Sequence, residues 1–173
     1  MATYIQIGST VTVGAGGASS ITFSSIPATY TDLVVKASLR TNRSDGILFD
    51  NCIMTFNGST SGYSGKLLYG LSGSATSINA GGSSSISFIY ATSSYATSNT
   101  FGNTEIYIPN YAGSTNKSVS VDGVSESNDT AAITALSASL WSNTAAINQI
   151  TIGQGTGTFV QYSTATLYGI SKS

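Results

Sequence analysis

The sequence predicts an all-β protein, an antiparallel two-sheet β-sandwich that is jelly-roll-like and has little or no helix. Three observations indicate this fold class. Apolar and polar residues alternate with a period of two along most of the chain, as half-buried strands do. Clusters of Gly, Ser, Asn or Pro interrupt the alternation about every 8 to 15 residues. Ser and Thr supply 54 of 173 residues, yet 17 aromatic residues and a net charge of −1 are typical of a folded chain.

The alternation predicts eleven strands. In chain order they span Tyr4–Val13, Ser20–Ser25, Asp32–Arg40, Asn51–Phe56, Lys66–Leu71, Ser84–Ala91, Thr104–Ile108, Ser118–Glu126, Ile133–Trp141, Gln149–Ile152 and Phe159–Tyr168. Eleven strands are too many for one open twisted sheet, so we expect two packed sheets.

Turn residues support several of these boundaries. The glycines of Gly14–Ser19 tolerate the positive φ angles that tight hairpins demand. Pro27 cannot donate a hydrogen bond to a sheet, so it ends the strand before it. Gly153–Gly157 separates the last two strands in the same way. The segments 81–85 and 91–100 are rich in Ser, Gly and Thr, and we expect exposed loops there.

Three segments allow more than one structure. Ile133–Trp141 has apolar residues at helical spacing as well as alternation, and we interpret it as a strand because its neighbours are strands. Ser142–Ile147 resembles a single capped turn, in which Ser142 or Asn143 accepts a hydrogen bond from a free backbone N–H. Asp122 and Gly123 form either a two-residue hairpin or part of one bulged strand.

The length of the chain fits a single β-sandwich domain, residues 1–173. Residues 1–18 comprise an N-terminal strand and a Gly-rich turn, which we expect to be available as an anchoring arm. No signal peptide is expected, because the start lacks a basic segment followed by an apolar one, and no window approaches the length of a membrane span. Cys52 is the only cysteine, so we expect it to be a small core residue rather than half of an intrachain disulfide.

The chain contains no histidine, which removes Ser–His–Asp and Cys–His catalysis and the commonest ligand of zinc and copper. Two-carboxylate glycoside hydrolysis needs only Asp and Glu, so Asp50 and Glu105 stay open as an acid pair. We do not expect an enzyme, and we assign no catalytic residue and no cofactor. The six Lys and Arg residues are scattered, so nucleic acid is not an expected partner, and Arg40 and Arg43 are expected on a solvated loop face.

Glu105 interrupts the apolar strand "FGNTEIYIPNY" and is expected to be structural. Alternation places it opposite Ile106 and Ile108, so it either faces water or pairs with a tyrosine hydroxyl or with a Lys such as Lys117. A second group of acids, Asp122, Glu126 and Asp129, supplies oxygen ligands within eight residues. Calcium prefers such ligands, but the spacing matches no EF-hand loop, so this is a weak calcium candidate and no metal site is assigned.

The ten tyrosines and one tryptophan divide into core and surface candidates. Tyr107, Tyr168 and Trp141 are expected to pack in the core. Tyr63, Tyr95 and Tyr111 have Gly, Ser or Asn neighbours that are typical of loops, so they are the candidates for surface contact. Amphipathic rings of this kind stack on sugars and dominate protein interfaces.

The segments "SSITFSSIPATYTDLVVKASLRT", "MTFNGSTSGYS", "FGNTEIYIPNYAGSTNKSVSVD", "LWSNTAAINQITI" and "FVQYSTATLYGI" resemble a β-sandwich module of tailed-bacteriophage virion proteins. The resemblance runs from about Ser19 to Ile170 and rests on strand and turn residues rather than an active site. It implies a non-enzymatic virion structural protein that is assembled in the host cytoplasm without a signal peptide.

Two types of virion protein fit the resemblance. The first is a capsid decoration, or cement, protein or a head-fibre protein that binds the major capsid protein, stabilises the shell and forms a homotrimer. The alternative is a tail-fibre or tail-tip module that binds host surface glycan. A free-standing module suits decoration better than a long adhesin. In either case we expect contact with other virion proteins, and none with a membrane.

Overall fold

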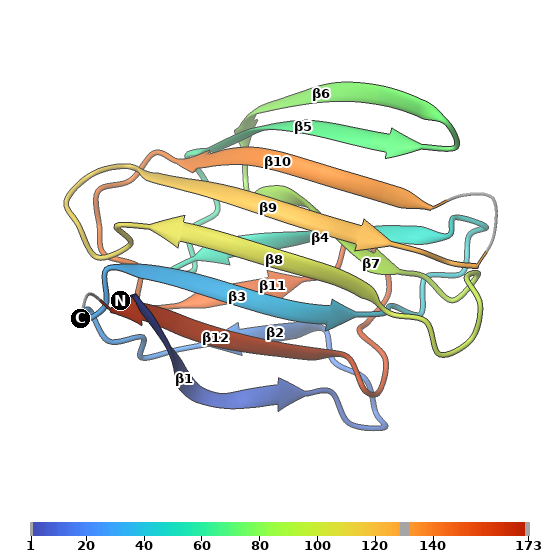
Figure 1. The fold of residues 1–173 in the computed structure, drawn as a ribbon, viewed down its shortest axis with the longest axis horizontal. Helices are drawn as coiled ribbons and strands as arrows, with labels where there is room; N and C mark the ends of the chain where they lie inside the picture. Colours follow the sequence, from blue (N-terminus) through green and yellow to red (C-terminus); the bar gives the residue numbers. More distant parts are fainter. Residues whose placement is uncertain (1, 129–131, 172–173) are drawn as a thin grey trace.

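The computed structural model describes residues 2–128 and 132–171, and these residues form twelve strands and no helix. The strands are β1 (Thr3–Thr12), β2 (Ser20–Phe23), β3 (Asp32–Leu39), β4 (Phe49–Phe56), β5 (Tyr63–Leu71), β6 (Ser74–Ser83), β7 (Ile86–Thr92), β8 (Gly102–Pro109), β9 (Lys117–Ser125), β10 (Ile133–Trp141), β11 (Ile150–Gly153) and β12 (Thr164–Ser171). They build two antiparallel sheets packed face to face (Figure 1), which confirms the predicted two-sheet β-sandwich. No helix in the described part of the chain is long and apolar enough to cross a membrane.

The order of the strands is that of a jelly roll. The large sheet has the order β1-β12-β3-β8-β9-β10-β5-β6, and the small sheet has the order β2-β11-β4-β7. If the pairs β5–β6 and β9–β10 are set aside, eight strands remain in two four-stranded sheets, and successive strands alternate between the sheets except β4 and β7, which pair within the small sheet. This arrangement is the double Greek key of a jelly roll.

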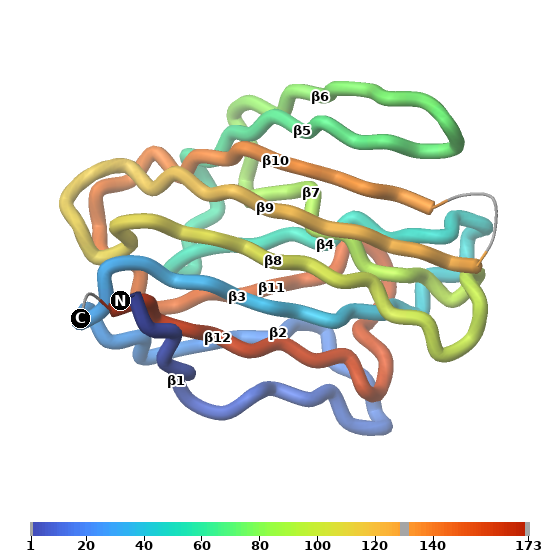
Figure 2. Tube along the Cα trace, in the orientation of Figure 1, coloured from blue at the N-terminus to red at the C-terminus, as the bar shows by residue number. Residues whose placement is uncertain are grey.

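The two remaining pairs extend the large sheet on one side. β5 and β6 lie between β4 and β7 in the chain, β9 and β10 lie between β8 and β11, and β10 pairs with both β9 and β5. All four strands therefore continue the large sheet beyond β8 (Figures 1 and 2). β7, the edge of the small sheet, contacts β8, β9, β10 and β5, whereas most residues of β6 are exposed.

The main core fills the space between the sheets. Its largest fully buried side chains include Trp141 and Tyr63 from the added strands, Phe56 from the small sheet, and Phe159. A second cluster of Leu67, Phe88, Tyr90, Ile133 and Ala135 lies under the extension. The regular alternation of buried and outward-facing residues in β9 and β10 shows why the period-two pattern identified both strands.

Asp122 and Gly123 belong to one continuous strand, β9, whose pairing with β10 shows no register shift. The hairpin alternative is therefore wrong, and no bulge is present. The inward position of Gly123 leaves room for β7, because a Cβ atom there would lie 3.2 Å from Thr104 Oγ1 and 4.0 Å from the backbone nitrogen of Tyr90.

Three other expectations need correction. Residues 81–83 are not a loop but the end of β6, which the sequence did not reveal because this edge strand is exposed on both faces and needs no alternation. Ser142–Ile147 forms no helical turn, although Asn143 Oδ1 accepts a hydrogen bond from the backbone N–H of Ala145, at 2.8 Å. The last strand begins at Thr164 rather than Phe159.

β1 is an edge strand of the large sheet. It pairs with β12, so that Thr3 lies opposite Ser171, and the backbone N–H of Val13 donates to Ser163 O. The segment that we considered as an anchoring arm is therefore incorporated into the chain's own sheet as far as Thr12. One side of β1 has no neighbouring strand among the residues that the structure describes, and its use in anchoring remains a prediction.

Candidate functional site

Arg40 joins two turns at one end of the sandwich. Its backbone C=O accepts hydrogen bonds from the backbone N–H of Val160, at 3.0 Å, and from the hydroxyl of Ser163, at 3.0 Å. Its side chain reaches in the other direction, where Nη1 donates to the carbonyl oxygens of Thr97, at 2.9 Å, and Thr100, at 2.8 Å. Arg40 thus fixes the Val160–Ser163 turn through its backbone and the Thr97–Thr100 turn through its guanidinium group.

The two turns have the same form. In each, the backbone N–H of the fourth residue donates to the carbonyl of the first, from Ser163 to Val160 and from Thr100 to Thr97. The third residue has a positive φ angle in both, 66° at Asn99 and 72° at Tyr162. Glycine is usual at such a position because it has no Cβ atom, and a bulky residue there is a genuine outlier.

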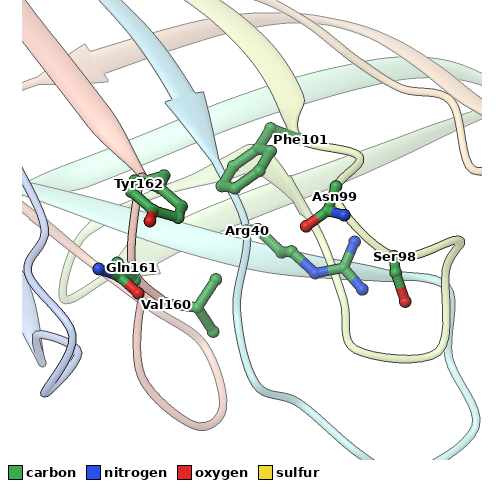
Figure 3. Close-up of a pocket in the computed structure, with 7 residues that line it drawn as sticks. All are labelled: Arg40, Ser98, Asn99, Phe101, Val160, Gln161 and Tyr162. Carbon is green, nitrogen blue, oxygen red and sulfur yellow. The ribbon is translucent and has the colours of Figure 1, made fainter.

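A pocket of about 340 Å³ lies between these turns. Figure 3 shows Arg40 between the segment that carries Ser98, Asn99 and Phe101 and the segment that carries Val160, Gln161 and Tyr162. These seven residues line the pocket. Tyr162 is the most exposed large apolar residue among those described, with 66% of its surface accessible.

The charge of Arg40 is buried without a carboxylate. The residue is only 8% exposed, and its Nη2 also donates to Ala96 O at 3.0 Å. Burial lowers the pKa of Arg40 from its usual value, although a guanidinium group stays protonated in proteins. The expectation that Arg40 lies on a solvated loop face is therefore wrong. Arg43 does lie in a loop, where it pairs with Asp45 at 2.8 Å and with Asp50 at 3.4 Å.

A second candidate surface is the outer face of the added strands. Leu68 on β5 lies directly opposite Leu136 on β10, and each is 55% exposed. Together with Ala138 they line a shallow depression of about 300 Å³, and Val124 of β9 faces outward on the same sheet, opposite Thr134 of β10. We call the exposed surface of Leu68, Val124, Leu136 and Ala138 the leucine face. Large side chains with this exposure on one continuous face are typical of contact surfaces.

Opposite charges flank the leucine face. Asp122 lies opposite Leu136 on the β9 side, and Lys66 lies opposite Ala138 on the β5 side. Lys66 Nζ donates to Asn79 Oδ1 at 3.2 Å and forms no ion pair with any described residue. Among the described residues, the Asp122 carboxylate has no hydrogen-bond or ion-pair partner.

Glu105 is a cross-strand polar residue, as expected, and its partner is Lys36. The two side chains lie opposite each other on β8 and β3, with Lys36 Nζ 2.9 Å from Glu105 Oε2. Lys117, the partner considered from the sequence, is instead fully buried and donates to the carbonyl oxygens of Gly113, Thr115 and Thr144.

The structure does not bring Asp50 and Glu105 together. Glu105 points outward from the large sheet, whereas Asp50 lies on β4 of the small sheet, where it is 1% exposed and paired with Arg43. Asp50 Oδ2 also accepts a hydrogen bond from the backbone N–H of Thr156, at 3.3 Å. Two carboxylates on opposite sides of a sheet cannot flank one glycosidic bond, so this acid pair is excluded.

The calcium candidate does not assemble from its described members. Asp122 lies on the outer face of β9, and Glu126 follows the end of that strand. Four residues of extended chain separate their Cα atoms by about 13 Å, which is too far for one ion. Glu126 Oε1 instead accepts a hydrogen bond from the backbone N–H of Asn128, at 2.6 Å. Asp129 lies outside the described residues, and within the described ranges no three His, Cys, Asp or Glu side chains form a metal-binding group.

Two of the three surface tyrosines are buried. Tyr63 is 1% exposed, and its hydroxyl accepts a hydrogen bond from the backbone N–H of Phe56 at 2.9 Å. Tyr111 is fully buried, and its hydroxyl donates to Pro27 O. The small neighbours suggested loops, but backbone groups of other segments satisfy both hydroxyls while the rings pack in the core. Tyr95 is exposed as expected, and its contact role remains a prediction.

The core assignment of three other aromatic residues is correct for Trp141 only. Tyr107 and Tyr168 lie on the outer face of the large sheet, on either side of Val34, and are partly exposed. The hydroxyl of Tyr107 donates to Asp32 Oδ2 at 3.0 Å. Alternation places Tyr107 on the face of Glu105, opposite Ile106 and Ile108, and Tyr168 opposite Leu167, so the core assignment was wrong because it followed the apolar character of the rings rather than their position in the strand.

Cys52 is fully buried, as expected of a small core residue. Burial raises the pKa of its thiol well above the usual value, which keeps it in the unreactive thiol form.

Comparison with protein-family models, with curated proteins and with solved structures finds no match for this chain.

Sequence reasoning missed both the pocket and the leucine face. A signal was present for the face, since Leu68, Leu136 and Ala138 occupy the alternate positions of strands that already have a buried apolar face. No signal identified the pocket, because it depends on two turns that are about 60 residues apart in the sequence.

Proposed function

We propose that this chain is a non-enzymatic structural protein of a tailed-bacteriophage virion, and that it self-associates through the leucine face. It acts as a capsid decoration or head-surface protein that binds the major capsid protein. The phage assignment is supported by the sequence resemblance. The self-association is supported by the leucine face itself, which carries exposed leucines on strands added to a complete jelly roll.

A second copy of the chain is the occupant that fits this face. The surface is apolar at its centre, with Asp122 on one side and Lys66 on the other. When the β9 side of one copy meets the β5 side of another, Asp122 pairs with Lys66 and the leucines are buried together. Burial of apolar surface supplies the affinity, and the charge pair selects the orientation. A net charge of −1 adds little repulsion between copies.

A closed ring uses this arrangement at every contact, because each copy presents its Lys66 side to one neighbour and its Asp122 side to the other. The resemblance implies three copies. Many copies on a shell would bridge capsid subunits and oppose the internal pressure of the genome. In this role the chain makes protein–protein contacts and catalyses no reaction.

Light scattering coupled to size-exclusion chromatography tests the self-association. We expect a mass of about three times the 17.6 kDa chain, and a monomer for Leu136→Lys. Ile47→Lys is the matched control, because Ile47 is 38% exposed outside the leucine face, and it should keep the wild-type mass. A monomeric wild type, or an unchanged mass for Leu136→Lys, would contradict the proposal.

A charge exchange tests the orientation. Asp122→Lys places like charges together and should weaken the oligomer, and adding Lys66→Asp to that variant should restore it. If the double variant does not recover the oligomer, the Asp122–Lys66 pairing is wrong. The apolar contact is tested separately by Leu136→Lys.

Mass spectrometry of purified particles of the encoding phage tests the virion assignment. It should detect the chain at many copies per particle, and its absence from them would exclude that assignment.

A further inference from the structure

We propose that the pocket between the Thr97–Thr100 and Val160–Ser163 turns binds a carboxylate-bearing sugar unit of an acidic polysaccharide. The inference is independent of self-association, because the pocket and the leucine face share no residue.

The first support is the strain at the pocket. Asn99 and Tyr162 both have positive φ angles, and both line this one depression. Asn adopts the left-handed region readily, but a tyrosine there is strained, and strained residues cluster at ligand sites. The hydroxyl of Ser163 bonds to both the N–H and the C=O of Arg40, at 3.1 and 3.0 Å, which fixes the turn that displays Tyr162.

The second support is the set of unused polar groups. The side chains of Ser98, Asn99 and Gln161 and the Tyr162 hydroxyl make no hydrogen bond to any described residue. Two amides and two hydroxyls supply both donors and acceptors, which matches the many hydroxyl groups of a sugar. The exposed ring of Tyr162 offers an apolar face with a polar edge, on which a pyranose ring can stack. A volume of about 340 Å³ suits one or two sugar units.

The third support is charge, and it selects an acidic sugar over a neutral one. The lining includes Arg40 and no carboxylate. The protein partners of its Nη atoms are backbone carbonyls and one hydroxyl, so the positive charge is not neutralised, and its Nε has no partner among the described residues. A charge that is largely removed from water attracts an anion more strongly than an exposed charge does. A carboxylate above Arg40 would supply the missing negative charge.

Isothermal titration calorimetry with trigalacturonate and maltotriose tests the proposal, because these oligosaccharides differ in carboxylate content. We expect trigalacturonate to bind at least ten times more tightly than maltotriose, and Tyr162→Ala to weaken its binding at least tenfold. Gln161→Glu places a negative charge in the pocket and should reduce trigalacturonate binding more than maltotriose binding. Tyr4→Ala is the control, since Tyr4 is 53% exposed and does not line the pocket, and it should bind as the wild type does.

Three results would overturn the proposal. The first is that trigalacturonate at 10 mM gives no heat of binding. The second is that the two oligosaccharides bind with equal affinity, and the third is that a folded Tyr162→Ala variant binds trigalacturonate as the wild type does. Competition with sodium acetate at the same carboxylate concentration separates a sugar site from a simple anion site. Displacement of trigalacturonate by acetate would show that the pocket recognises an anion alone.

Discussion

Tyr63 and Trp141 lie opposite each other on β5 and β10 and stack with their ring centroids 6.1 Å apart and their planes 15° from parallel. Phe56 of the small sheet packs against Trp141 at 5.5 Å. Tyr63 and Trp141 come from the two added strand pairs and Phe56 comes from the small sheet. The three rings therefore connect the extension of the large sheet to the jelly-roll core. Trp141 is the only tryptophan of the chain, so its fluorescence reports on this junction.

Trp141→Ala should therefore lower the free energy of unfolding by about 3 to 5 kcal/mol, because it removes a fully buried ring and leaves a cavity between the sheets. Urea unfolding followed by circular dichroism measures the change. Tyr95→Ala, at an exposed site, should stay within about 0.5 kcal/mol of the wild type. A loss below about 1 kcal/mol for Trp141→Ala would contradict the packing described here.

Arg40→Met should lower the free energy of unfolding by about 2 to 3 kcal/mol, because the loop carbonyls lose their charged donor. The segment 93–101 should then become a site of rapid limited proteolysis. Arg40→Lys should be intermediate, since an ammonium group cannot reproduce the fork of a guanidinium group. Lys36→Met, at an exposed cation outside the leucine face, serves as the control. Equal protease resistance of Arg40→Met and the wild type would show that Arg40 does not hold this loop.

Lys117→Met should cost about 1 to 3 kcal/mol. The Lys117 ammonium group donates to Gly113 O at 2.7 Å and to two other backbone carbonyls, and methionine would leave these acceptors without a donor. Burial lowers the pKa of Lys117, which means that the folded protein disfavours its charged form. Removing this charge therefore offsets part of the stability that is lost with the hydrogen bonds. Chemical unfolding at pH 7 measures the balance. A more stable Lys117→Met variant would show that the burial cost exceeds the three hydrogen bonds.

Stability should fall as the pH rises from 10 to 12, in part through Tyr90. Burial, with a smaller contribution from Tyr69, raises the pKa of Tyr90 from 10.0 to about 12. Between these values the folded state binds more protons than the unfolded state, so raising the pH favours unfolding. At pH 11 the loss from this one group is about 1 kcal/mol. Tyr90→Phe should lose less stability than the wild type between pH 9 and pH 11, and equal losses would contradict the assignment.

Most strands could be predicted from the sequence because their two faces meet different environments. β9 alternates strictly between the core and water, β10 does so except at the half-buried Leu140, and the prediction for β10 matched both of its ends. β6 was missed because it is an edge strand with both faces exposed, and its only signal is the two-residue turn at Ser72 and Gly73, where both φ angles are positive. Tyr63 and Tyr111 were misplaced because the groups that satisfy their hydroxyls come from other segments of the chain.

The fold class, the absence of histidine chemistry and the strand character of most of the chain follow from residue identity and local periodicity. The three-dimensional arrangement was needed to show that Glu105 pairs with Lys36, that Asp50 lies away from Glu105, that Leu68 meets Leu136, and that Arg40 joins two distant turns. These relationships depend on strand order and register. Pairing between strands far apart in the chain places side chains together that no local pattern connects.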